Sequence, residues 1–360
     1  MNSAESFSVD YVEARAKFLD AAKAAGASLQ SVRHPEAGRR GETLYTDVAW
    51  IGPRAASRVL VMISGTHGVE GFCGSGAQVD WLRRGEAATL GADVAVLLIH
   101  AINPYGFSWL RRVTHENVDL NRNWVDFGAP LPANNDYDQL ADALVPSDWS
   151  PQSQSASMGV IGAFMASHGM PALQQAVSGG QYRHDKGVFF GGFAPTWSRR
   201  TQTDIFREYL GQAARVGIID FHTGLGPWGY GERIVTDAPG SAGYDRARSW
   251  YGAAITCPSA GTSTSADITG DGLEAAPRSI PHAEVTGVAL EVGTKPTLEV
   301  LAALRADAWL HSYGDPASPE AEPIKATIRD AFYGDSDDWK GMVAGQSLVL
   351  IRSGLTALAA

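Results

Sequence analysis

The chain contains 360 residues, of which 44% are hydrophobic, and its formal net charge is −10. Proteins of this length in the α/β class often form one domain with insertions, so residues 1–360 are expected to form a single domain. Its 39 acidic residues outnumber its 29 basic ones, and no Lys/Arg-rich run occurs, which argues against binding to nucleic acid or to anionic membranes. The expected partner is a small molecule or a short peptide, and the composition leaves the oligomeric state open.

Cysteine usage restricts the kinds of metal site that the chain can form. Cys73 and Cys257 are far apart and outside any CxxC pair, so neither a disulfide framework nor a thiolate metal site is predicted. The first 26 residues mix acids, bases and helix formers and lack the apolar core of a signal peptide. No uninterrupted apolar run approaches the length of a membrane span. These patterns indicate a cytoplasmic protein whose metal ligands, if any, are His and carboxylate.

The N-terminal third shows a helix, strand, strand, helix order. Helical periodicity predicts a helix over 8–26, and the alternating run 42–52 predicts a strand. The β-branched-rich run 59–63 predicts a strand buried on both faces, and a helix is expected over about 74–84. Later apolar runs predict strands at 94–99, 216–221, near 232–236 and near 286–291, and helices at 158–177 and 203–214.

Two segments differ from this alternation. The stretch 128–157 is rich in Pro, Asn, Asp and Ser and has no sustained period, which predicts a loop-rich insertion and a candidate pocket wall. The tail from about 297 is expected to be mainly helical. Strands that alternate with helices predict an α/β fold with a central mixed, mostly parallel sheet flanked by helices.

Two histidines, His67 and His222, directly follow predicted buried strands, at the sheet edge where open α/β folds bind ligands. Glu70 lies three residues after His67, and one tight turn lets side chains at this spacing converge. Two His and one Glu are the ligand set of a catalytic zinc, which keeps a fourth position for water. Taken alone, however, the HxxE pattern is also explained by a turn histidine and a helix N-terminal carboxylate. Asp220 is either an outer carboxylate that orients His222 or a polar residue at a strand end.

Other motifs point away from competing chemistries. Residues 224–229 satisfy GxGxxG after a predicted strand, but no helix follows to face a pyrophosphate, so no dinucleotide site is predicted. The chain has no GxSxG elbow, no Walker A loop and no HExxH helix. Five histidines fall outside any ligand pattern and are expected to be core or surface residues: His115, His168, His184, His282 and His311.

Five motifs occur in a characteristic order: His67-Gly-Val-Glu70, then residues 103–107 (NPYGF), residues 118–124 (VDLNRNW), His222, and residues 290–293 (LEVG). This order resembles the zinc carboxypeptidase superfamily. The Glu-Val-Gly ending is similar to the branch that contains aspartoacylase and succinylglutamate desuccinylase, whereas DLNRNW is similar to the carboxypeptidases themselves. The THGVEG and HTGLGP signatures resemble a little-characterised bacterial group within the superfamily.

The resemblance implies a zinc site and a general base. His67, Glu70 and His222 would hold one Zn²⁺ per chain. Glu291 would take a proton from water and pass it to the leaving nitrogen, since a carboxylate in a partly dry pocket can transfer protons near neutral pH. The alternative for Glu291 is a strand-end carboxylate in an ion pair, but its place after an apolar strand makes burial without a function costly.

The resemblance also implies how a substrate is held. Asn121 and Arg122 would bind a substrate carboxylate, because a guanidinium matches two carboxylate oxygens. Arg112, or else Arg111, would stabilise the oxyanion formed on attack at the carbonyl. The alternative is that these arginines are solvated surface residues. Tyr182 and Tyr230 lie in Gly-rich loops, and the sequence assigns them no role.

The predicted function is therefore that of a zinc-dependent hydrolase that cuts an amide bond in a small carboxylate-bearing substrate. Removal of a C-terminal residue from a peptide and deacylation of an N-acyl amino acid both remain open. A hypothesis of a different class is a zinc-binding protein without catalysis, which is expected to lack a ligand or the base, and none is missing here.

Overall fold

The computed structural model describes residues 2–360, and its centre is one eight-stranded sheet in the order β1-β2-β4-β3-β5-β8-β6-β7. The strands are β1 (Ser28–Ala37), β2 (Thr43–Ile51), β3 (Arg58–Ile63), β4 (Val94–His100), β5 (Arg215–Thr223), β6 (Gly231–Ile234), β7 (Ile255–Thr256) and β8 (Glu284–Val292). The central strands β4, β3, β5 and β8 run parallel, whereas β1, β2 and β6 pair antiparallel with β2, β4 and β8. The sheet is mixed and mostly parallel, as predicted.

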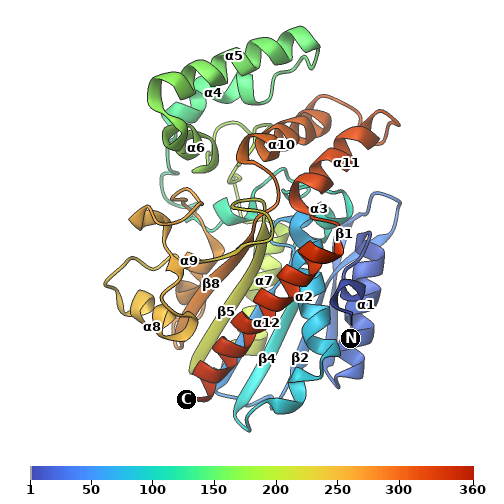
Figure 1. The fold of residues 1–360 in the computed structure, drawn as a ribbon, viewed down its shortest axis with the longest axis vertical. Coiled ribbons are helices and arrows are strands. Elements are labelled where there is room, and N and C mark those ends of the chain that lie inside the picture. Colours follow the sequence, from blue (N-terminus) through green and yellow to red (C-terminus); the bar gives the residue numbers. More distant parts are fainter. Residues whose placement is uncertain (1) are drawn as a thin grey trace.

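Helices cover both faces of this sheet and one of its ends (Figure 1). They are α1 (Tyr11–Ala24), α2 (Gly71–Arg83), α3 (Pro104–Ser108), α4 (Asn135–Leu144), α5 (Pro151–His168), α6 (Met170–Ser178), α7 (Trp197–Leu210), α8 (Ala242–Tyr251), α9 (Gly272–Ser279), α10 (Thr297–Ser312), α11 (Ala321–Phe332) and α12 (Asp337–Ala359). In Figure 1, α1, α2 and α12 lie in front of the sheet and α7 lies behind it, while α4, α5 and α6 stand above the strands beside α10 and α11.

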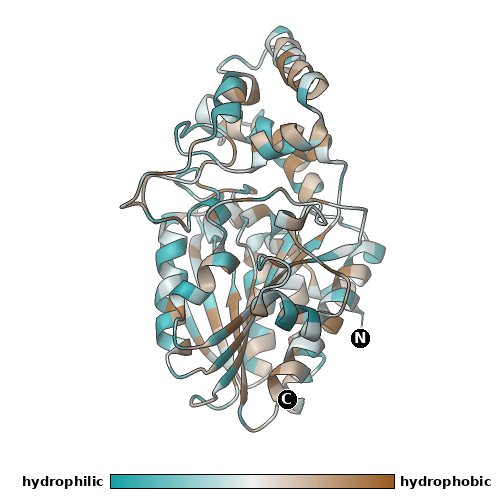
Figure 2. Cartoon of the chain, turned by 90° about the vertical axis from the view of Figure 1, so that its left-hand side faces the viewer, coloured by the Kyte–Doolittle hydropathy of each residue, from teal (hydrophilic) through white to brown (hydrophobic). Residues whose placement is uncertain are grey.

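The central strands are buried on both faces, as the apolar run at 59–63 predicted. In β3, Leu60 and Met62 belong to one hydrophobic cluster with residues of α1, α2 and α12. Val59, Val61 and Ile63 belong to a second cluster with residues of α7 and α9. This alternation follows from the two-residue period of a strand. Figure 2 shows the resulting hydrophobic residues along the strands.

Helix α12 differs from what the sequence indicated about membrane-spanning segments. It is 23 residues long, and its length and composition alone would allow it to cross a membrane. In the structure Val343, Leu350, Ile351 and Leu358 of this helix are buried in the cluster that covers the front of the sheet. The helix therefore packs against the core along one side, which buries 39% of its apolar window.

The segment 128–157 is not the loop that its composition predicted, because it contains α4 and the start of α5. The Asn134 side chain caps α4 by accepting a hydrogen bond from the backbone N–H of Tyr137 at 2.9 Å. Tyr137, Leu140 and Leu144 are buried on one side of α4. This helical spacing was present in the sequence, but the surrounding Pro and Asn residues obscured it.

The predicted helix at 158–177 is two helices, α5 and α6, separated at Gly169. Gly169 has φ 86°, and Pro171 occupies the first turn of α6. Proline lacks the N–H that a continuous helix would need, so the chain has to begin a new helix there. Helix α7 also begins at Trp197, earlier than predicted, and β1 and β7 were not predicted.

Helices α4, α5, α6, α10 and α11 share a third hydrophobic cluster, separate from the two that sandwich the sheet. From residue 297 onward the chain is mainly helical, in α10, α11 and α12. We call α4, α5 and α6, together with α10 and α11, the cap. The cap stands over the end of the sheet at which β3, β5 and β8 end (Figure 1).

Candidate metal centre and cavity

The candidate site lies at the carboxyl ends of three neighbouring strands. His67 follows β3 after a short turn, His222 is the penultimate residue of β5, and Glu291 is the penultimate residue of β8. His222 and Glu291 are register partners on parallel strands, which places their side chains on the same face of the sheet. The fold thus brings His222 and Glu291, which are far from His67 in the sequence, to the same edge of the sheet as His67.

The loop that carries His67 and Glu70 is held tightly against the segment 103–112. The backbone N–H of Gly68 donates to the carbonyl of Arg112 at 3.1 Å, and that of Val69 donates to the carbonyl of Arg111 at 2.8 Å. A Cβ atom at Gly68 would lie 2.0 Å from the carbonyl carbon of Gly106. Glycine is therefore required at this position, because two backbone segments approach closely.

His67, Glu70 and His222 converge on one point in a buried environment. His67 Nδ1 lies 3.0 Å from Glu70 Oε1, and His222 Nδ1 lies 3.1 Å from both His67 Nδ1 and Glu70 Oε2. The facing imidazole nitrogens and the shared carboxylate form a cluster of potential metal ligands. This donor set suits a divalent cation such as zinc, so the residues fit the metal that the sequence motif implied.

The second nitrogen of each imidazole faces a carboxylate. His67 Nε2 lies 3.1 Å from Asp119 Oδ1, and His222 Nε2 lies 2.9 Å from Asp220 Oδ2. The Thr66 hydroxyl donates to Asp220 at 2.8 Å. Metal-binding histidines usually have such partners, because a carboxylate fixes the tautomer and the ring orientation. Asp220 occupies the orienting position considered for it, whereas Asp119 was missed although it lies inside the quoted motif.

The electrostatics of Glu70 match those of an ionised ligand. Burial by itself would raise its pKa, but the neighbouring His67, His222 and Arg112 lower the pKa of Glu70 below its usual range. Its Oε2 also accepts a hydrogen bond from the backbone N–H of Thr223 at 3.0 Å. Glu70 is therefore a carboxylate at neutral pH, as metal ligation requires.

The structure distinguishes the two adjacent arginines that the sequence left as alternatives. Arg112 Nη1 donates to Glu70 Oε1 at 2.8 Å, and its Nε donates to Asp119 Oδ2 at 3.0 Å. Arg111 instead donates to Asp307 Oδ2 at 3.0 Å, away from the cluster. Arg112 is thus the guanidinium beside the candidate ligands, and its role toward an oxyanion stays a prediction.

Glu291 has the environment of a proton-transfer group. Its Oε1 accepts a hydrogen bond from the backbone N–H of Leu225 at 2.9 Å, which leaves Oε2 without this donor. Burial, together with the negative charge of Glu70, raises the pKa of Glu291 to about 7. A carboxyl group with such a pKa can both accept and return a proton near neutral pH.

Asn121 and Arg122 lie in the same region and are held by the backbone. Asn121 Oδ1 accepts from the N–H of Gly272 at 3.2 Å, so its amide nitrogen is the group left for a ligand. Arg122 Nε donates to the Ser178 carbonyl at 3.0 Å, Nη2 donates to the same oxygen, and Nη1 donates to the Asn121 carbonyl at 2.9 Å. A guanidinium has five N–H groups, so donors remain on both Nη atoms.

The tyrosines that were given no role have different positions. The Tyr182 hydroxyl is buried and donates to the carbonyl of Arg122 at 2.6 Å, so this residue supports the Asn-Arg motif. Tyr230 is 51% exposed. In residues 2–360, the metal-ligating cluster consists of His67, Glu70 and His222, and the histidines set aside earlier lie outside it.

These side chains share one cavity with a volume of about 1170 Å³, counting the part open to solvent. Six residues singled out from the sequence line it: His67, Arg112, Asn121, Arg122, His222 and Glu291. The remaining walls come mainly from α6, α10 and the loop before α9. Sequence reasoning found the polar end of the cavity, while the apolar walls from α6 and α10 were not anticipated.

The fold is similar to that of carboxypeptidase A from Helicoverpa armigera, with a TM-score of 0.52 and 13% identity over 98% of this chain and 73% of that chain. It is also similar to bovine thrombin-activatable fibrinolysis inhibitor, with a TM-score of 0.51 and 10% identity over 99% of this chain and 98% of that chain. Similarity to an aspartoacylase family protein from Mesorhizobium loti is lower, with a TM-score of 0.37 and 13% identity over 79% and 67% of the two chains. The protein therefore has a carboxypeptidase-like α/β fold, as the resemblance predicted.

The family assignment comes from the sequence. The model of the family described as "Protein of unknown function (DUF2817)" matches residues 7–346, so the chain belongs to this family. No curated protein matches the sequence.

Proposed function

We propose that this protein is a zinc-dependent hydrolase that cleaves an amide bond in a small carboxylate-bearing substrate, as a carboxypeptidase does. The observation that carries this proposal is the convergence of His67, Glu70 and His222 at a cavity that His67, His222 and Glu291 line. These three ligands would hold one Zn²⁺ per chain. The chemistry that such an ion supplies is polarisation of a carbonyl and a lowered pKa of a water molecule beside it.

Glu291 would carry the proton through the reaction. With a pKa of about 7, its Oε2 can take a proton from the attacking water and return it to the leaving nitrogen. Such general acid–base catalysis contributes about 10²–10⁴-fold to the rate. Arg112, which lies beside Glu70, would donate hydrogen bonds to the oxyanion that develops on the former carbonyl oxygen.

Asn121 and Arg122 would anchor the substrate through its carboxylate. The amide nitrogen of Asn121 and the remaining N–H groups of Arg122 are donors in the cavity wall. Because backbone carbonyls already fix the orientation of the guanidinium, little conformational entropy would be lost on binding. This anchoring suits both the removal of a C-terminal residue and the deacylation of an N-acyl amino acid.

A zinc-binding protein without catalysis is the alternative of a different class. It is disfavoured because a base with a pKa near neutrality is kept in the cavity beside the ligands, where burying a carboxyl group carries a cost. A cytoplasmic location and a small-molecule or short-peptide substrate remain part of the proposal.

The test uses Glu291→Gln, with Glu284→Gln, at the opposite end of β8, as the matched control. Elemental analysis is expected to find about one zinc per chain in the wild type and in both variants. Release of amine from N-acyl amino acids and short peptides is expected to fall at least about 100-fold in Glu291→Gln alone. Full activity of Glu291→Gln, or of metal-free wild type, would disprove the proposal.

A further inference from the structure

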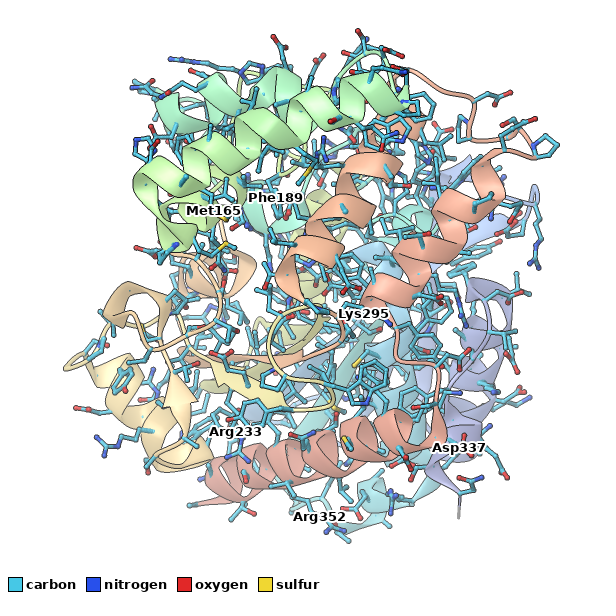
Figure 3. The ribbon with its side chains drawn as sticks, turned by 45° about the horizontal axis from the view of Figure 1, so that its top comes forward. Met165, Phe189, Arg233, Lys295, Asp337 and Arg352 are labelled. Atoms are coloured by element: carbon cyan, nitrogen blue, oxygen red, sulfur yellow. The ribbon has the colours of Figure 1, made fainter. Side chains whose placement is uncertain are left out.

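The cavity continues from the candidate metal centre into an apolar region between two cap helices. Leu173 and Val177 of α6 line the cavity, and so do Leu301 and Leu304 of α10. Phe189 also lines the cavity, and all five residues belong to or pack against the hydrophobic cluster of the cap. We call these five residues the α6–α10 wall. Figure 3 labels Phe189 below the α5–α6 helices and beside α10.

The titratable groups in the cavity come from outside α6 and α10. The titratable groups of the lining are His67, Arg112, Arg122, His222, Asp271 and Glu291. Helices α6 and α10 contribute uncharged residues to the lining, of which Gln174, Ser178 and Thr297 are polar. A ligand group that lies against the α6 and α10 residues would leave water without gaining a charged partner from these helices, so an apolar group is favoured there.

The rim of this region also exposes apolar side chains to solvent. Met170 at the start of α6 is 38% exposed, and Leu298 at the start of α10 is 43% exposed, and both line the cavity. Apolar side chains that line a cavity and remain partly exposed to solvent favour an apolar ligand there.

Phe189 connects the wall to the charged end. Its ring lies 5.2 Å from the guanidinium carbon of Arg112 and 5.5 Å from that of Arg122. Its backbone has φ 55°, an uncommon conformation for a residue other than glycine. Such strain persists where the surroundings impose it, and it often occurs at functional sites. The ring is thus held where the polar end meets the apolar wall.

The two halves of the proposed substrate can be assigned to different ends of the cavity. Asn121 is tied to the start of α9 through the N–H of Gly272, and Arg122 is tied to the carbonyl of Ser178 at the end of α6, so the substrate carboxylate would lie between these two helix ends. Leu273 of α9 and Ala289 of β8 also line the cavity. The acyl half then has the space that Leu173 of α6 and Leu301 and Leu304 of α10 line, away from Ser178.

We propose that the acyl half of the substrate is a large, uncharged, apolar group that binds against the α6–α10 wall. This inference rests on the proposed function, because it takes the scissile amide to lie at the metal end. An aliphatic acyl chain and an apolar amino-acid side chain share this chemistry. A small or charged acyl group, such as succinyl, would be a poor substrate.

The first experiment measures kcat/KM for zinc-loaded wild type on one amino acid acylated with acetyl, butyryl, hexanoyl, octanoyl or succinyl groups. Each buried methylene is expected to raise kcat/KM about fourfold, and succinyl is expected to react more slowly than butyryl. A parallel dipeptide series with Gly, Leu or Phe as the acyl residue distinguishes a preference for an aliphatic acyl chain from a preference for an apolar amino-acid side chain. A rate independent of acyl size in both series overturns the inference.

The second experiment measures binding without turnover. Calorimetric titration of zinc-loaded Glu291→Gln with the octanoyl and the acetyl amino acid is expected to give a dissociation constant at least about 100-fold lower for octanoyl. Adding Leu301→Asp is expected to remove this preference. Ala302→Asp, an exposed change on the same helix outside the lining, is expected to keep it.

The outcomes separate the two proposals. If no amide is cut but octanoyl binds preferentially in a manner sensitive to Leu301→Asp, the proposed function fails and the apolar site stands. If amides are cut but the octanoyl preference is absent, or persists in a folded Leu301→Asp variant, the apolar site is wrong. Thermal unfolding of each variant identifies any that fails to fold. If Leu301→Asp fails to fold, Leu301→Trp replaces it. The larger side chain fills the region, so the same loss of the octanoyl preference is expected.

Discussion

Neighbouring residues in the chain carry different tasks in this site. Arg112 contacts Glu70 and Asp119 beside the candidate ligands, whereas Arg111 donates to the buried Asp307. The same Asp307 accepts a hydrogen bond from the buried Lys325 at 2.5 Å, so Arg111 ties the site to α10 and α11. Arg112 therefore lies at the candidate metal centre, whereas Arg111 binds to the cap.

We expect Arg112→Gln to lower kcat about 10²–10³-fold, since it removes a donor aimed at developing negative charge. KM is expected to change less, because the substrate carboxylate is held elsewhere. Steady-state kinetics on zinc-loaded protein measures both constants. A large rise in KM with unchanged kcat would show that Arg112 binds the ground state instead.

Single elements of the fold decide whether the ligands meet. The loop after β3 delivers His67 and Glu70 because Gly68 lets it approach the backbone of Gly106. The segment 128–157, which was expected to be loop-rich, supplies α4 and the start of α5 to the cap. The helix break at Gly169 sets the start of α6, which contributes Leu173 and Val177 to the cavity wall.

We expect Gly68→Ala to weaken zinc binding at least about tenfold, because the new Cβ would force the ligand loop away from Gly106. Competition with a chelator measures the affinity. Gly341→Ala on α12 is the matched control, since a Cβ there meets nothing within 4 Å. The control is expected to bind zinc normally and to be equally or slightly more stable. Equal zinc affinity in the two variants would contradict this account of the loop.

The whole molecule joins a sheet that carries the ligands to a cap that carries the cavity walls. The sheet is buried on both sides, and this burial includes ionisable groups far from the cavity. His100, at the end of β4, stacks on Phe18 at 4.4 Å between ring centroids and contacts the Ser75 hydroxyl at 2.9 Å. Burial lowers the pKa of His100 to about 4.

Because the folded-state pKa of His100 is lowered, its contribution to stability is present above the unfolded-state value near 6.5 and is lost as pH falls toward 4. We expect the free energy of unfolding to fall between pH 7 and pH 5 by about 2 kcal/mol more in wild type than in His100→Gln. Urea unfolding at the two pH values measures this difference. An identical pH dependence in both proteins would show that His100 is not responsible.

Much of the fold and the ligand set could be predicted from local patterns. The apolar runs at 59–63, 216–221 and 286–291 predict buried strands because their spacing and length are local properties of the chain. His67, His222 and Glu291 follow or end those strands, so the edge at which they meet follows from a mostly parallel order.

Only the tertiary structure shows which side chains from distant segments contact one another. The pairing of His67 with Asp119, the choice of Arg112 over Arg111 and the apolar wall between α6 and α10 all join residues from separate elements. Local periodicity contains no information on which side chain meets which across such separations. The sequence by itself therefore determined the fold class and the metal-binding residue types, and packing of the cap over the sheet decided the shape and polarity of the space in front of them.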